Sequence, residues 1–135
     1  MPQHITVVDY TPCWPSKFIK EREAIKKVLE DHYLFIYHIG STAVPNLAAK
    51  PIIDIMVVVE NLDDVDKAAD KFVKIGYDYL GEFGIAGRRY LRKGGAERTH
   101  QIHIFQADDW YNITRHLAFK TYLQKMSLCD SNTNI

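Results

Sequence analysis

Residues 38–59 read HIGSTAVPNLAAKPIIDIMVVV, and this stretch decides the fold of the chain. Its first residues lead into Gly40 and Ser41, a pair that breaks a strand and begins a turn. Residues 52–59 are apolar on both faces, which predicts a central strand covered by other layers. Asp54 is the one charge within this strand. A buried carboxylate is costly unless it is hydrogen-bonded, paired or bound to a metal ion, so Asp54 is a candidate functional residue.

Helical and extended patterns alternate on both sides of this stretch. Helices are expected to begin near Trp14, near residue 61 and at Asp108. Further strands are expected over residues 33–39, 77–80, 88–92 and 99–105. The buried stripes expected on the second and last helices are Val65, Ala68, Ala69, Phe72 and Val73, and Trp110, Ile113, Leu117, Ala118 and Tyr122. This order predicts an α/β (α+β) fold, a mixed sheet of about five strands flanked by helices.

The composition is that of one ordinary globular domain. The chain has 135 residues, 47% of them hydrophobic, and a formal net charge of zero. We assign residues 1–126 to a single domain and the polar residues 127–135 to a disordered tail. The balanced charge argues against a general nucleic-acid or membrane-surface binder. No segment approaches the roughly 20 apolar residues of a membrane span. The two cysteines form no CxxC pair, so we expect the protein to be located in the reducing cytoplasm.

A phosphate site is the functional interpretation of the turn after residue 39. Gly40 lets backbone N–H groups approach an anion, and Ser41 and Thr42 add hydroxyl donors. Lys50, at the end of the loop that follows, is counted as a further phosphate ligand. The structural interpretation is an ordinary turn with a capping serine.

Asp54 has two explanations that the residues alone leave open. A divalent cation such as Mg²⁺ prefers carboxylate oxygens, so Asp54 could ligate a metal ion. The alternative is an ion pair with an arginine of the basic hairpin that carries Arg88, Arg89 and Arg92. The guanidinium groups of these arginines suit the binding of phosphate. The structural interpretation is a solvent-exposed hairpin whose positive charge is balanced by the acidic residues between 60 and 70.

Two histidines on the last expected strand lie on opposite faces. His100 and His103 are three residues apart, which places them on different sides of a regular strand. His103 shares a face with Gln101 and Phe105, and either histidine taken singly is more often a hydrogen-bonded structural residue than a metal ligand. A zinc hydrolase built from His38, His100 and His103 is disfavoured by the same argument.

The motif of residues 38–55 closely resembles that of the GrpB family, which is similar to a branch of the nucleotidyltransferase-fold superfamily. Further resemblance is carried by residues 10–15 (YTPCWP), 84–90 (GIAGRRY), 98–103 (RTHQIH) and 116–119 (HLAF), so that it covers about residues 5 to 124. In the superfamily, a Gly-Ser pair holds a triphosphate and three acids hold two divalent metal ions.

The resemblance assigns roles to positions of this chain. Gly40 and Ser41 match the phosphate-binding pair, and Asp54 matches the first acid. Met56 stands where the second acid is expected, and the strand that would supply the third acid offers Gln101 and His103. A thioether is a poor ligand for Mg²⁺, so this set of acids is incomplete.

Two functions follow from these residues. The first is a domain that binds a nucleotide or another phosphorylated small molecule, with Mg²⁺ or Mn²⁺ as cofactor and nucleotidyl transfer as its reaction. Asp54 and His103 would then be the catalytic and metal-binding residues. The alternative is a non-catalytic interaction or scaffold domain that retains the fold after losing the acids.

Overall fold

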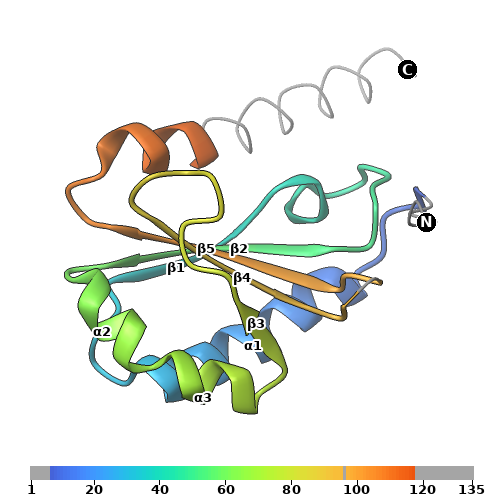
Figure 1. Cartoon of the computed structure of the whole chain (residues 1–135). Helices are drawn as coiled ribbons and strands as arrows, with labels where there is room; N and C mark the ends of the chain where they lie inside the picture. The colour runs from blue at the N-terminus through green and yellow to red at the C-terminus, as the bar shows by residue number, and fades with distance from the viewer. Residues whose placement is uncertain (1–6, 96, 118–135) are drawn as a thin grey trace.

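The computed structural model describes residues 7–95 and 97–117 (Figure 1). Its elements are α1 (Cys13–Leu29), β1 (Phe35–Ile39), the 3₁₀ helix η1 (Ser41–Ala43), β2 (Ile53–Val59), α2 (Leu62–Lys67), α3 (Ala69–Lys74), β3 (Tyr77–Tyr79), β4 (Arg88–Lys93) and β5 (His100–Gln106). A last helix runs over residues 110–117. The tail expected over residues 127–135 lies outside the described residues, as do Ala118 and Tyr122.

The strands form one mixed sheet in the order β1-β2-β5-β4-β3. β2 and β5 are parallel, and the other three neighbouring pairs are antiparallel. The expected mixed sheet of five strands flanked by helices is therefore confirmed. β2 lies second in the sheet with a neighbouring strand on each side, and its apolar side chains are buried because both faces of the sheet are covered.

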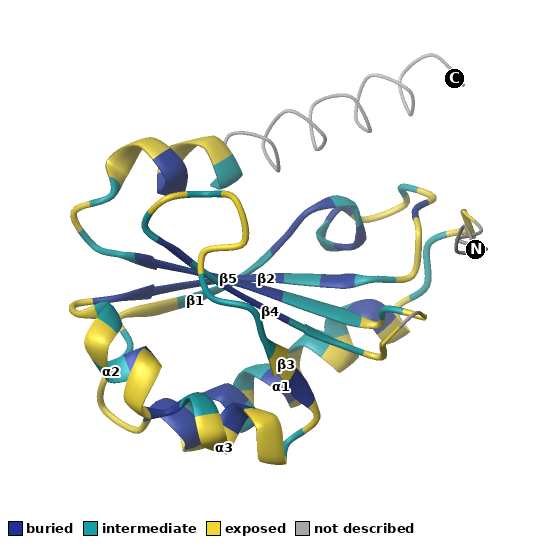
Figure 2. Ribbon diagram, viewed as in Figure 1, coloured by how far each residue is buried: buried dark blue, intermediate teal, exposed yellow. Residues whose placement is uncertain are grey.

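Each face of the sheet has its own apolar layer (Figure 2). Ile55 and Val57 of β2 face α1, α2 and α3, where they join a core that includes Trp14 and Phe72. The alternate residue Met56 faces the other side, in a smaller core cluster that contains Phe105 of β5 and Ile113 of the last helix. Since strand side chains alternate, Asp54 points to the same side as Met56. Within the described residues no helix is both long and apolar enough to cross a membrane.

The helix expected after residue 61 is two short helices. α2 ends at Lys67, and the backbone N–H of the following residue, Ala68, donates to the carbonyls of Asp64 and Val65 and closes the last turn. α3 then starts in a new direction, which buries Phe72 and leaves Val73 55% exposed. The expectation that Val73 lies in the core is therefore wrong.

Two expectations about the last helix are also wrong. The side chain of Asp109, not that of Asp108, accepts from the backbone N–H of Asn112 and caps the helix. Trp110 is 72% exposed, because the helix turns Asn112 and Ile113 toward the sheet and its first residue away from it.

A buried ionic cluster joins α1 to the sheet. The Glu21 carboxylate accepts a hydrogen bond of 2.7 Å from the Tyr77 hydroxyl and one of 2.6 Å from Lys93 Nζ. Burial raises the pKa of Glu21, but the hydrogen bonds from Lys93 and Tyr77 and the charge of Lys93 outweigh it and hold the pKa below its ordinary value of 4.5. Glu21 is therefore charged in the folded protein at neutral pH.

Glu21→Gln should destabilise the protein at pH 7 by about 1–3 kcal/mol, because Lys93 loses its buried partner. A carboxyl whose pKa is depressed by folding stabilises the folded state above the ordinary pKa and loses this effect as the pH falls through the folded value. The wild-type advantage over Glu21→Gln should thus shrink below pH 4.5 in urea unfolding. Glu23→Gln, at an exposed acid on the same helix, is the control and should cause little change; equal stability losses in the two variants would contradict the assignment.

Candidate functional site

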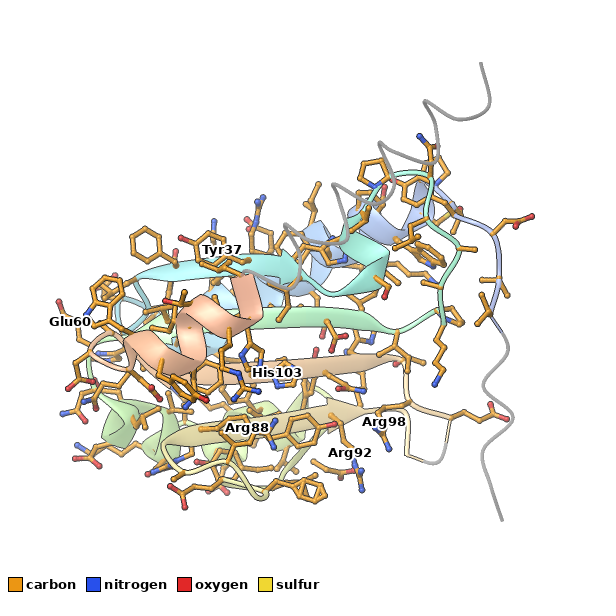
Figure 3. All side chains as sticks on the ribbon, turned by 90° about the horizontal axis from the view of Figure 1, so that it is seen from above. Tyr37, Glu60, Arg88, Arg92, Arg98 and His103 are labelled. Atoms are coloured by element: carbon orange, nitrogen blue, oxygen red, sulfur yellow. The ribbon has the colours of Figure 1, made fainter. Side chains whose placement is uncertain are left out.

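A pocket of about 620 Å³ opens on the face of the sheet that carries the last helix. It is lined by Ile39, Gly40, Asp54, Ile85, His103, Arg115 and His116. Figure 3 looks onto this face, with His103 on β5 and Arg88 and Arg92 on β4. β1, β2, β5 and the last helix each contribute to the pocket, so it forms only when the sheet is assembled.

Gly40 allows the turn after β1 to pass close to Asp54. Ile39 and Asp54 are register partners in the β1–β2 ladder, so Gly40 follows directly beside the carboxylate. Gly40 has φ 73° and ψ −170°, a backbone conformation that is essentially limited to glycine. A Cβ atom at this position would lie 2.7 Å from Asp54 Oδ2. Both the conformation and the contact therefore require glycine.

His103 connects Asp54 to Arg88. Its Nε2 lies 3.4 Å from Asp54 Oδ1, and its Nδ1 lies 3.3 Å from a terminal guanidinium nitrogen of Arg88. Because a guanidinium can only donate, Nδ1 accepts this bond and is unprotonated. The proton of the neutral imidazole is then on Nε2, which donates to the carboxylate. Among the described residues no arginine forms an ion pair with Asp54, so the structure does not bear out the alternative of a direct pair with the hairpin.

Arg88 is held rigidly as a buried cation. It donates to the backbone carbonyls of Glu82 and Phe83 at 3.2 and 2.8 Å, and its guanidinium lies 4.6 Å from the ring centroid of Tyr90. Arg88 is only 8% exposed, and burial lowers its pKa. An arginine remains charged despite such a shift, so a permanent positive charge lies behind the imidazole.

His116 is a pocket residue that the sequence reasoning did not assign to the site. Its Nδ1 donates to the carbonyl of Asn112 at 2.7 Å, and its ring centroid lies 5.1 Å from that of His103. Burial lowers its pKa, more than the Asn112 bond raises it, so the ring is neutral and Nε2 is an acceptor. The sequence feature that could have assigned His116 to the site is its spacing of three residues from Ile113, which places both side chains on the inner side of the helix.

Several predicted ligands lie away from this pocket. The Thr42 hydroxyl donates to the Ile52 carbonyl at 3.0 Å and is bonded to His38, so it supports the loop. Arg89 points to the helical layer and forms two bonds with Asp66, at 2.8 and 3.2 Å.

The other predicted ligands also make no contact in the pocket. The Arg92 guanidinium lies 5.6 Å from the ring centroid of Phe83. Lys50 is exposed, and neither it nor the Ser41 hydroxyl has a side-chain partner within residues 7–95 and 97–117. Ser41 follows Gly40 directly at the start of η1, so it lies next to the pocket without lining it.

The residues present do not fit a two-metal centre. Met56, at the position of the second acid, is fully buried in the apolar cluster. In the part of the chain that the structure describes, no group of three or more His, Cys, Asp or Glu side chains could hold a metal ion. Both ring nitrogens of His103 are engaged, which leaves Asp54 Oδ2 and His116 Nε2 as donors. One carboxylate and one imidazole are a poor set for Mg²⁺, which prefers oxygen ligands.

The opposite faces predicted for the two strand histidines are confirmed. His100 lies 3.7 Å from Glu21 on the α1 side, and His103 faces Asp54. His38 stacks on Phe18 of α1 at 4.9 Å between ring centroids. The three histidines of a zinc hydrolase therefore do not converge.

Gly40→Ala should destabilise the protein clearly more than Gly81→Ala. Gly81 also has a positive φ, 61°, but a Cβ there meets nothing within 4 Å, so it costs only the roughly 1–2 kcal/mol of the left-handed backbone. At Gly40 the contact with Asp54 adds to that cost. Urea unfolding of both variants measures the difference, and equal losses would show that the close approach to Asp54 is unimportant.

Arg88→Met should change the tautomer of His103. We expect Nε2–H alone in the wild type and a mixture with Nδ1–H in the variant, because the donor on Nδ1 is gone. Long-range ¹H–¹⁵N NMR spectra distinguish the two nitrogens. Arg89→Met, on the other face of the same strand, is the control, and a wild-type Nδ1–H signal would contradict the assignment.

Comparison with known proteins places these observations in a family. The chain matches the family "GrpB protein" over residues 4–128. It is 41% identical over 120 residues to the UPF0157 protein YqkA of Bacillus subtilis, covering 89% of this chain and 35% of that protein. It also resembles the crystal structure of the conserved protein GrpB from Enterococcus faecalis, with a TM-score of 0.86 and 52% identity over 89% of this chain and 73% of the other.

A more distant likeness concerns the fold alone. The Cid1 poly(U) polymerase superposes on 85% of this chain and 38% of its own, with a TM-score of 0.54 and 13% identity. The mixed sheet with its flanking helices is thus of the nucleotidyltransferase type. The family itself is shown by the match to the GrpB model over residues 4–128, so the chain belongs to the GrpB family.

Proposed function

We propose that this domain binds a nucleotide or another phosphorylated small molecule in the pocket at Gly40. The observation that carries the proposal is the convergence of Asp54, His103 and the fixed cation Arg88 beside a turn that only glycine can form. Burial of polar and charged groups costs stability that their mutual hydrogen bonds offset only in part, and ligand pockets are typically lined by a few such convergent polar groups.

The charges around the pocket favour an anion. Arg115 lines it, and within the described residues no acidic side chain lies within 4.0 Å of that guanidinium. Arg88 adds a second positive charge behind His103. Asp54 is the one acid in the lining, and its Oδ1 accepts a hydrogen bond from His103. A phosphate would contact Arg115, while Asp54 Oδ2 would face the cation that accompanies a nucleotide.

Mg²⁺ or Mn²⁺ therefore enters this proposal only as the counter-ion of the nucleotide. No transfer step is assigned, because Met56 stands where the resemblance expects the second acid, and the strand that would supply the third offers only Gln101 and His103. The Cid1 structures include complexes with MgATP and MgGTP, which supports a nucleotide as the first ligand to test.

A scaffold without a ligand is the second candidate. The observation that favours it is Met56, which has become part of the core together with Ile39 and Phe105. In that case Asp54 is a residual charge that costs stability. Asp54→Asn would then raise the free energy of unfolding, because it removes a partly buried charge and keeps a polar group beside His103.

Calorimetric titration with ATP, CTP, GTP and UTP, each with Mg²⁺ or Mn²⁺, tests the two functions. We expect at least one nucleotide to bind and Asp54→Asn to weaken it about tenfold, or about 1.4 kcal/mol. Arg89→Met should leave the affinity unchanged, since that side chain faces the helical layer. Absence of binding to all four nucleotides, with a more stable Asp54→Asn variant, would reject the ligand site and favour the scaffold.

A further inference from the structure

A second, separate groove lies on the outer side of the helical layer. It has a volume of about 760 Å³ and is formed by α1, α3 and the end of β4. Five lysines line it, two from each helix and one from the strand: Lys20, Lys27, Lys71, Lys74 and Lys93. The groove faces away from the pocket at Gly40, because α1 and α3 cover the other side of the sheet (Figure 1).

Three of these lysines have no counter-charge. Among the described residues, no carboxylate lies within 4.0 Å of the ammonium groups of Lys20, Lys27 or Lys74. Lys71 has a partner only at 3.8 Å, the exposed Glu30 at the end of α1. Lysines from two packed helices thus face one groove, where their like charges repel one another unless an anion is present.

The two acids in the lining neutralise only one of its five lysines, Lys93, which forms an ion pair with Glu21. Glu21 is buried and already accepts hydrogen bonds from Tyr77 and Lys93. Glu23 lies 3.4 Å from both Arg22 and Lys26, which belong to α1 but not to the groove. The neutral charge of the whole chain therefore hides a locally positive surface.

The floor of the groove is apolar and decides between kinds of anion. Ala24, Val28 and Ile75 are the apolar residues of the lining. A nucleic-acid backbone gains nothing from such a floor, since its affinity comes from phosphates. A peptide segment with acidic and aliphatic side chains can pair its acids with the lysines at the rim of the groove and pack its aliphatic groups on the apolar floor. Amphipathic segments bind other helix-lined grooves in this way.

We infer that the α1–α3 groove binds an acidic, amphipathic peptide segment of a partner protein. The lysine rim supplies the charge complementarity, which raises the association rate and selects against basic partners. The apolar floor receives the aliphatic side chains of the peptide. This interaction is independent of the proposed nucleotide pocket, because the two sites lie on opposite sides of the sheet.

Fluorescence anisotropy with labelled dodecapeptides tests the inference. The probes are four repeats of Glu-Glu-Leu, with four repeats of Glu-Glu-Ser and of Gln-Gln-Leu as controls, and a twelve-nucleotide oligo(dT). We expect the Glu-Glu-Leu peptide to bind best, and its affinity to fall at least tenfold in Lys27→Glu/Lys74→Glu. The matched control Lys17→Glu/Lys67→Glu makes the same charge change on exposed helix positions outside the groove and should bind normally.

The remaining outcomes decide against the inference. Equal binding of the Glu-Glu-Ser peptide would show that the floor plays no part, and tighter binding of the oligonucleotide would indicate a phosphate-binding surface instead. Equal losses in the two double variants would mean that only net charge matters. Thermal unfolding shows whether each variant is folded. If Lys27→Glu/Lys74→Glu does not fold, Lys27→Gln/Lys74→Gln is used in its place.

Discussion

The burial of β2 between two apolar layers is the constraint on which the rest of the structure depends. Ile55 and Val57 pack against α1 and α3, and Met56 packs against the last helix, so neither face of the strand can be left to solvent. This requires helices on one side and a covering helix on the other. The pocket forms at the start of β2, beside the last helix, where Asp54 is still partly exposed.

Asp54 is accommodated by a chain of groups from distant parts of the sequence. His103 donates to it, and Arg88 donates to His103 from the neighbouring strand. The order β2-β5-β4 in the sheet brings these three residues onto one face, although 34 positions separate Asp54 from Arg88 in the sequence. On the same face Met56 packs in the apolar cluster, and within residues 7–95 and 97–117 no group of three or more His, Cys, Asp or Glu side chains could hold a metal ion.

Charge is separated between the two sides of the molecule. Arg88 and Arg115 lie on the side of the pocket, and the lysine groove lies on the outer side of α1 and α3. Arg89, which the sequence grouped with Arg88, instead pairs with Asp66 of α2. Adjacent residues of a strand point to opposite faces, so one basic hairpin serves both a structural ion pair and the site.

The sequence by itself determined the sheet, the central strand, the glycine turn and the opposite faces of His100 and His103, because these follow from local periodicity and backbone sterics. It did not determine the division of α2 from α3, the exposure of Trp110 or the place of His116. Nor did it determine that Asp54 pairs with His103 rather than with an arginine. Those features depend on which surfaces meet, and only the tertiary structure decided them, since strand order and helix direction bring together residues that no local pattern connects.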